Sequence, residues 1–455
     1  MTHRILIKGA IVLSMDDAVG TFRDADVLVE GEKIAAVGPN LSAEGAETID
    51  GRGRIVIPGI VNGHMHTWQT GLRSLCSNMT LLEYFRWVHR GLATAFLPND
   101  IYIATLAGAL GQINAGATTL GDWCHNNPTP AHTDAAVDAL FESGIRAVFL
   151  HGSPKPDPKP GEPHFSEVPH PRHEIERLMK SRFASRDQLV TLGMAILGPH
   201  YSTMEVSRAD FRLAREMGLV ASMHQGGGEA KTPGGWERLE EEGLVGEGIN
   251  IVHGNNLTDE QIRRFVGAGV SFTVAPENEM IQGHGWPLTG RVIAAGGQPT
   301  FGIDIESVVS ADMFSVARAA LACERALENA AYREEHGGIP DASKVTTRDA
   351  LRWITIETAR MLGIDDKVGS LTPGKQADIT VLDATAWNMW PVHDPYSTVI
   401  MQAGVGNVEH VLVAGKFRKR DGKLIWPDTD RVKRDLEASG RRIVAQLGIP
   451  TLIDA

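Results

Sequence analysis

The amino-acid sequence predicts an α/β protein built on a (β/α)8 (TIM) barrel, with a smaller β-rich domain formed by both ends of the chain. Two observations predict the barrel. Eight apolar, strand-like segments recur between residues 55 and 365, and helical patterns separate most of them. A third observation predicts the second domain, because short strand-like segments with Gly, Pro and Asp turns fill residues 1–54 and return after residue 366. We therefore expect a β-sandwich from residues 1–54 plus 366–455, with a C-terminal helix, and a barrel over residues 55–365.

Composition and charge narrow the function classes. The 455 residues are 42% hydrophobic and 22% charged, and the formal net charge is −12. An acidic chain of this kind is unsuited to binding nucleic acid or anionic membranes. Three cysteines without a C-x-x-C pair indicate neither a disulfide framework nor a thiolate zinc site. Without an apparent signal peptide or membrane span, we expect a cytoplasmic protein that acts on a small molecule.

The terminal segments are expected to supply the β-rich domain. Strand-like runs lie at residues 5–7, 25–29 and 33–37, and the C-terminal part adds runs at 378–383, 397–403 and 408–414. The basic run at residues 416–420 is better explained as a solvated strand edge or hairpin than as a binding patch.

The eight barrel strands are expected in the middle of the chain, at residues 55–63, 115–123, 145–152, 189–200, 219–225, 248–254, 269–276 and 298–304. Helices are expected near residues 134–144 and 207–218, where apolar residues recur at spacings of three and four before a Gly. An open doubly wound sheet is the alternative, but no Gly-rich phosphate loop follows the first strand. Residues 152–173 are rich in Pro and Gly and are expected to form a loop over the barrel mouth or a disordered insertion.

Polar residues at the strand ends predict a metal site. His64 and His66 follow an apolar run, and residues two apart in a strand point to the same side. His224, His253 and Asp304 end the fifth, sixth and eighth expected strands, so all five side chains should converge at one end of the barrel. Nitrogen and carboxylate ligands without a thiolate favour Zn²⁺, with Fe²⁺, Co²⁺ and Mn²⁺ as alternatives.

Two longer motifs carry a family resemblance. Pro58-Gly-Ile-Val-Asn-Gly-His-Met-His66 and Gly369-Ser-Leu-Thr-Pro-Gly-Lys-Gln-Ala-Asp-Ile-Thr-Val-Leu-Asp383 resemble the amidohydrolase superfamily, in its mononuclear-metal branch of triazine hydrolases and cytosine- or adenosine-derivative deaminases. The resemblance covers nearly the whole chain. It implies a distorted barrel beside a β-sandwich, a hydrolase of non-peptide C–N bonds, and a homo-oligomer.

The resemblance also implies roles for individual residues. His64, His66, His224 and Asp304 would bind one divalent metal, while His253 would contact the bound water or the substrate, with direct ligation left open. Binuclear relatives use a Lys at the end of strand four, where this chain reads Leu197-Gly-Pro-His200. The metal would lower the pKa of its water toward about 7, giving a hydroxide that attacks the substrate. Asp304 would take the proton from that water, and His253 would orient it.

One departure bears on the substrate. Deaminase-type relatives carry His-x-x-Glu after strand five, and here the Glu position is Gly227. Attack on a heterocycle benefits from protonation of a ring nitrogen, whereas a carbonyl puts its charge on oxygen, which the metal can hold. We therefore expect an amide, urea or carbamate substrate, as in the phenylurea and molinate hydrolases. The alternatives are a deaminase or chlorohydrolase of a triazine, purine or pyrimidine, and a metal-free scaffold protein.

Six further residues are expected to contact a ring-bearing substrate because they follow strand ends, although packing or hydrogen bonding within loops would explain each of them as well: Trp68, Gln69, Trp123, His151, His200 and Glu279.

Overall fold

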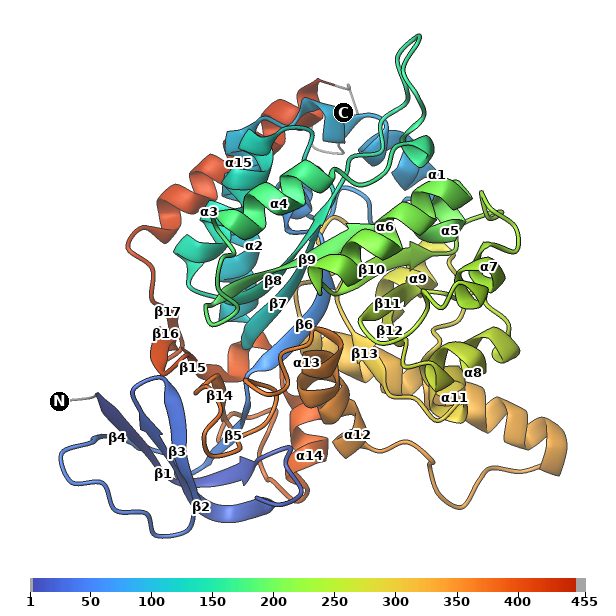
Figure 1. Cartoon of the computed structure of the whole chain (residues 1–455). Helices are drawn as coiled ribbons and strands as arrows, with labels where there is room; N and C mark the ends of the chain where they lie inside the picture. Colours follow the sequence, from blue (N-terminus) through green and yellow to red (C-terminus); the bar gives the residue numbers. More distant parts are fainter. Residues whose placement is uncertain (1–2, 447–455) are drawn as a thin grey trace.

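Two β-sheets organise the computed structural model, which describes residues 3–446. The larger part of the chain folds around eight parallel strands that follow one another around a barrel in chain order (Figure 1). The barrel and its terminal sheet confirm the predicted fold class. The barrel strands are β6 (Ile60–Met65), β7 (Ala117–Cys124), β8 (Arg146–Gly152), β9 (Val190–Ile196), β10 (Ala221–Gln225), β11 (Ile249–His253), β12 (Ser271–Val274) and β13 (Pro299–Phe301).

The barrel closes where the end of β6 meets the residues after β13. The N–H of Asp304 donates to the carbonyl of His64 over 3.0 Å, and the N–H of His66 donates to the carbonyl of Asp304 over 2.9 Å. Gly302 permits this approach, because a Cβ atom there would lie 2.3 Å from the carbonyl oxygen of His64. The closure places Asp304 beside the two histidines of the first strand.

Helices cover the outside of the barrel and connect its strands. α3 and α6 confirm the two expected helices, and each ends at a glycine with positive φ, Gly144 and Gly218. The longer helices are α2 (Pro98–Asn114), α3 (Pro130–Ser143), α4 (Arg172–Lys180), α6 (Met204–Met217), α7 (Gly235–Glu241), α8 (Asp259–Gly267), α9 (Pro276–Gln282), α10 (Thr289–Ala294), α11 (Met313–His336), α12 (Thr347–Arg352) and α15 (Thr429–Ala445). Four short helices complete the set: α1 (Leu81–Tyr84), α5 (Gly198–Tyr201), α13 (Thr358–Met361) and α14 (Pro395–Ser397).

The prediction of a single strand at residues 55–63 is wrong, because this segment is divided between two strands that belong to different sheets. β5 (Arg54–Pro58) pairs with terminal strands, and β6 begins the barrel at Ile60. The chain crosses at Gly59, where a Cβ atom would lie 2.0 Å from the Thr118 hydroxyl. The strand expected at residues 189–200 is shorter in the structure than predicted, because β9 ends at Ile196 and α5 follows it.

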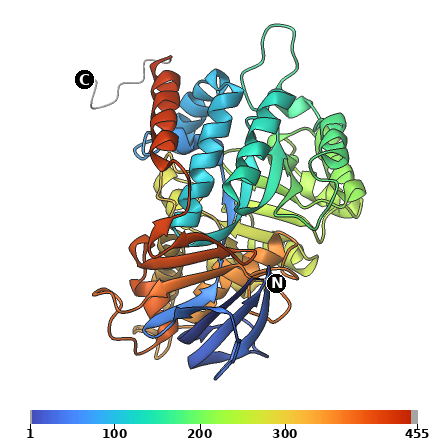
Figure 2. The ribbon, with the colours of Figure 1, turned by 90° about the vertical axis from the view of Figure 1, so that its left-hand side faces the viewer.

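The terminal strands form one mixed sheet in the order β17-β16-β15-β14-β5-β1-β2-β3, with β4 paired to β1. Figure 2 shows strands from both ends of the chain side by side at the bottom of the view. The joint is the antiparallel pairing of β14 with β5. The strands are β1 (Arg4–Leu13), β2 (Thr21–Glu30), β3 (Lys33–Gly38), β4 (Glu47–Asp50), β5, β14 (Ile379–Asp383), β15 (Val408–Val413), β16 (Lys416–Arg420) and β17 (Lys423–Leu424).

The prediction of a terminal strand at residues 397–403 is wrong, because most of these residues are helical. Pro395 begins α14, and the Asp394 side chain caps it by accepting from the N–H of Tyr396 over 3.0 Å. The basic run at residues 416–420 forms β16 and a hairpin with β17, as predicted.

Helix α15, which the predicted division assigns to the terminal domain, packs on α2 of the barrel (Figures 1 and 2). The Ser439 hydroxyl donates to the Asp100 carboxylate over 2.6 Å at this contact. The domain boundaries stay a prediction, and residues 1–2 and 447–455 of the terminal domain lie outside the described residues. Among the helices within residues 3–446, none combines the length and apolar character needed to cross a membrane.

Candidate active site

Four side chains from three barrel strands converge at the carboxyl ends of the strands. His64 and His66 come from β6, His224 comes from β10, and Asp304 follows β13. One potential ligand atom from each residue lies within 4.8 Å of the others. The Nε2 atom of His64 lies 3.2 Å from Nε2 of His224 and 3.2 Å from Oδ1 of Asp304, and Nε2 of His66 lies 3.3 Å from the same oxygen.

These distances suit a bound divalent metal. A tetrahedral ion with bonds of about 2.0–2.1 Å holds neighbouring ligand atoms about 3.3–3.4 Å apart. The Nδ1 atoms of His64 and His224 have no hydrogen-bond partner among the described residues. Three imidazoles and one carboxylate are a common donor set for divalent metal ions. A metal ion held by such a set would lower the pKa of the water bound to it. The four residues therefore form a cluster that can hold a divalent metal.

The protonation states agree with this use of the cluster. Burial lowers the pKa of His64 to about 4 and that of His224 well below its usual range, so both rings are neutral at pH 7. Burial alone would raise the pKa of Asp304, but hydrogen bonds to His64 and His66 hold it well below the ordinary value. Neutral imidazoles and an ionised carboxylate are the forms that bind metals.

Further contacts orient the cluster. Nδ1 of His66 lies 2.5 Å from the Trp123 carbonyl, so a proton on Nδ1 leaves Nε2 free. The side-chain amide of Asn278 donates to Oδ2 of Asp304 over 2.5 Å. Asp304 and His253 both have positive φ, 67° and 66°, a conformation that non-glycine residues rarely adopt. Such backbone strain is concentrated at functional sites.

His253 lies beside the cluster and is held from behind by Glu279. Its Nδ1 atom lies 3.0 Å from Oε1 of Glu279, and its Nε2 atom lies 3.6 Å from Oδ2 of Asp304. Glu279 is fully buried at the start of α9 and also accepts from the N–H of Ala275 over 2.9 Å. Burial alone would lower the pKa of His253, but these two carboxylates raise it. Glu279 therefore fixes the orientation of His253 and favours its protonated form.

We expect Glu279→Gln to reduce turnover by about 10–100-fold, because residues that orient an active-site histidine typically contribute that much. The measurement is kcat of the purified variant, with circular dichroism to establish folding. Glu277→Gln makes the same change on the same helix, and Glu277 does not contact His253, so it should retain activity. Equal activity of both variants would contradict the role of Glu279.

A small cavity lies over the cluster. Its free volume is ≈ 30 Å³, about that of one water molecule, so a ring-shaped substrate requires part of the wall to move. Part of the wall is apolar or aromatic: Leu81, Tyr84, Phe85 and Tyr201. The remaining wall residues outside the cluster are polar: His89, His125, Lys155, His253, Gln282 and His284.

None of the six substrate residues predicted from sequence is among the described residues that line this cavity. Trp68 donates from Nε1 to His125 over 3.4 Å, and Gln69 donates to the Tyr84 hydroxyl over 2.6 Å. Both therefore lie behind wall residues. Trp123 packs its ring 4.2 Å from that of His224. Their contact with substrate stays a prediction.

The other three predicted residues lie farther back. His151 pairs with His170 over 3.0 Å. His200 lies in α5, with Nδ1 3.3 Å from the side-chain amide of Gln225. Glu279 supports His253 as described above.

Sequence reasoning missed several wall residues. Tyr84 ends α1, His89 lies in the helical turn that follows α1, and His284 lies just after α9. These are short connections between barrel strands, and their sequences do not indicate which side chains face the cavity. Lys155 lies just after β8, in the Pro-rich segment that was expected to cover the mouth. That expectation was the one signal in the sequence that could have identified Lys155.

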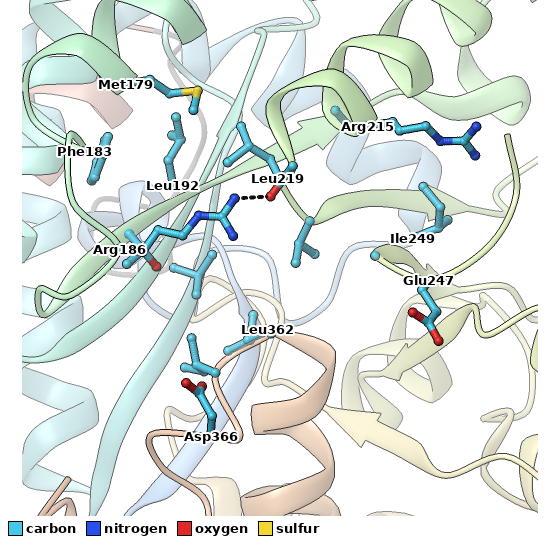
Figure 3. A pocket seen from close by; sticks show the side chains of 18 of the residues that line it. Met179, Phe183, Arg186, Leu192, Arg215, Leu219, Glu247, Ile249, Leu362 and Asp366 are labelled. Carbon is cyan, nitrogen blue, oxygen red and sulfur yellow. Dashed lines mark hydrogen bonds between the residues drawn. The ribbon is translucent and has the colours of Figure 1, made fainter. Parts of the chain in front are cut away.

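A larger cavity lies at the opposite end of the barrel strands. Its volume is ≈ 790 Å³, and its wall includes Leu192, Leu219 and Ile249 near the beginnings of β9, β10 and β11 (Figure 3). Arg186 in its wall donates to the carbonyl of Gly218 over 2.5 Å. None of the metal-binding candidates lines it, so the smaller cavity at the carboxyl ends is the candidate active site.

A nearly closed parallel barrel with three imidazoles and a carboxylate at the carboxyl ends of its strands is the arrangement of a metal-dependent hydrolase. The chain belongs to the amidohydrolase family, whose profile matches residues 55–418. It is thus a hydrolase that acts on carbon–nitrogen bonds other than peptide bonds.

Similar sequences include several deaminases. A 5-methylthioadenosine/S-adenosylhomocysteine deaminase of Symbiobacterium thermophilum is 29% identical, over 98% of this chain and 100% of the relative. A 5′-deoxyadenosine deaminase of Methanothermobacter thermautotrophicus is 27% identical, over 92% of this chain and 94% of the relative.

Solved structures share the fold. A zinc-bound adenosine deaminase of Xanthomonas campestris has a TM-score of 0.81 at 23% identity, covering 97% of this chain and 98% of that one. An atrazine chlorohydrolase of Arthrobacter aurescens, also with zinc, has a TM-score of 0.81 at 23% identity, covering 96% of this chain and 100% of that one.

Proposed function

We propose that this protein is a zinc-dependent aminohydrolase that releases ammonia from an amino-substituted N-heterocycle of the adenosine type. The observation that carries this proposal is the convergence of His64, His66, His224 and Asp304 in a chain whose near-full-length relatives include adenosine-derivative deaminases. An aromatic wall beside the cluster suits a flat ring.

Each residue of the cluster has a role in this proposal. The three histidines and Asp304 hold one zinc ion, and the segment after β9 offers no lysine to bridge a second. Asp304 accepts a proton from the attacking water, since it is the one carboxylate among the described residues that line the cavity. His253, held by its contact with Glu279, orients that water and the substrate.

Hydrolysis of a carbonyl C–N bond, the first expectation from the sequence, is the second candidate. It is favoured by Gly227, where φ is +84° and a Cβ atom would lie 2.9 Å from Leu81 and 3.0 Å from the Tyr201 hydroxyl. The space for an acidic side chain at that position is therefore filled. The named relatives favour the deaminase over the phenylurea-type hydrolase.

A substrate screen with metal analysis tests the proposal. Adenosine, 5′-deoxyadenosine and amino-triazines would be assayed for ammonia release, and phenylureas, anilides and carbamates for amine release. We expect one equivalent of zinc and ammonia from an adenosine derivative. Amine release alone would favour the second candidate. Protein without metal and without turnover would favour the scaffold hypothesis.

A further inference from the structure

A buried cation without a carboxylate partner lines the candidate active site. Lys155 extends from the segment after β8, and its Nζ atom lies 5.6 Å from the ring centre of Trp123 and 5.1 Å from that of Tyr201. The residue as a whole is partly exposed, but its ammonium end lies against the fully buried Trp123. Within residues 3–446, the side chain forms no ion pair or hydrogen bond, and two aromatic rings lie against its charge.

A buried ammonium without an anionic partner is costly. The titratable groups around Lys155 are the hydroxyl of Tyr201 and the rings of His89, His125, His200 and His224. His224 belongs to the metal-binding cluster, and Nδ1 of His200 lies 3.3 Å from the side-chain amide of Gln225. The Tyr201 hydroxyl already donates to the carbonyl of Gly226.

The chemistry of the proposed function requires a proton donor in this cavity. When water adds to the amino-bearing carbon of a heterocycle, the electron pair of the ring C=N bond moves to the ring nitrogen, which must be protonated. Asp304 belongs to the metal-binding cluster, and the ring of His253 lies between Glu279 and Asp304, at 3.0 and 3.6 Å. Lys155 is the one lysine or arginine among the described residues of the wall. Burial lowers the pKa of Lys155 to about 8, close to working pH, where proton transfer is efficient.

We propose that Lys155 is a catalytic residue that donates its proton to the ring nitrogen of the heterocyclic substrate. This inference rests on the proposed deaminase function. As the C–O bond forms, one water proton passes to Asp304 and one Lys155 proton passes to the ring nitrogen. As the C–N bond breaks, the proton on Asp304 passes to the amino group, which leaves as ammonia. The remaining hydroxyl proton restores Lys155, so the products are the ring lactam and ammonia.

Three substitutions test this role. Lys155→Met removes the proton with little change in length, Lys155→Arg keeps the charge but does not release a proton near neutral pH, and Lys159→Met is a matched control at an exposed lysine of the same segment. We expect kcat to fall by about 10²–10⁴-fold in both Lys155 variants and to remain unchanged in Lys159→Met. In the wild type, kcat should fall as pH rises through the pKa of Lys155, and this limb should be absent in Lys155→Met.

Binding gives a second measurement that is independent of turnover. Calorimetry on metal-free protein would compare adenosine with 1-deazaadenosine, in which a C–H group replaces the ring nitrogen. The wild type should bind adenosine at least about tenfold more tightly, and Lys155→Met should remove this preference.

Three results would overturn the inference: kcat of Lys155→Met within about threefold of wild type, recovery of kcat by Lys155→Arg, or an unchanged binding preference in Lys155→Met. Failure of the proposed function is distinguishable, because it would appear as wild-type protein that releases no ammonia from any amino-heterocycle.

Discussion

Asp304→Asn is expected to reduce turnover by at least about 10³-fold while the protein remains folded. The substitution keeps the size of the side chain but removes the charge that faces His64 and His66 at 3.2 and 3.3 Å. It also removes the proton acceptor, and general-base catalysis alone contributes about 10²–10⁴-fold. The measurements are kcat on the substrate found in the screen and metal content by plasma mass spectrometry.

His66→Ala complements this experiment, because it removes one proposed ligand and leaves the acceptor in place. We expect substoichiometric metal and no measurable turnover. His336→Ala, at an exposed histidine that ends α11, is the matched control and should retain both metal and activity. Full activity of Asp304→Asn or His66→Ala would show that the cluster is not the active site.

The second large effect concerns stability. Arg146→Met is expected to lower the free energy of unfolding by about 3–5 kcal/mol, because it leaves a buried carboxylate without its partner. Arg146 begins barrel strand β8 and donates two hydrogen bonds, of 2.9 and 3.0 Å, to Asp378 beside terminal strand β14. Both side chains are buried, with exposed fractions of 6% and 1%. Urea denaturation followed by circular dichroism measures the loss.

Arg52→Met is a control of matched geometry. Arg52 also donates two hydrogen bonds to one carboxylate, Asp50, at 2.9 and 2.6 Å, but both side chains are mostly exposed. Exposed ion pairs contribute little, because water solvates the separated charges nearly as well. The unfolding midpoint of Arg52→Met should therefore match wild type. Equal effects of the two substitutions would show that the Arg146–Asp378 pair does not join the barrel to the terminal sheet.

Much of the barrel and of its metal cluster is predictable from sequence, because both depend on local patterns. Apolar runs predict buried strands wherever they occur, and parallel strands bring their carboxyl ends to one edge. His64, His66, His224, His253 and Asp304 could therefore be expected together before their distances were known. The structure confirms that they converge.

The parts that could not be predicted depend on contacts between distant segments. The run at 55–63 has the apolar character of one strand, and only its partners in two sheets divide it at Gly59. The run at 397–403 has strand-like residues, but the Asp394 cap and Pro395 begin a helix.

The residues of the cavity wall also depend on contacts between distant segments. Lys155, His284 and Tyr84 reach it from connecting segments whose paths depend on packing rather than on periodicity. The sequence by itself thus determined the barrel class, most of its strands and the group of side chains that converge as metal-binding candidates, because those follow from hydrophobic pattern and strand direction. Only the tertiary structure decided that Glu279 stands behind His253, that Leu81 and Tyr201 fill the space at Gly227, and that Lys155 faces the cavity. These contacts join residues far apart in the chain, and no local spacing encodes which of them will meet.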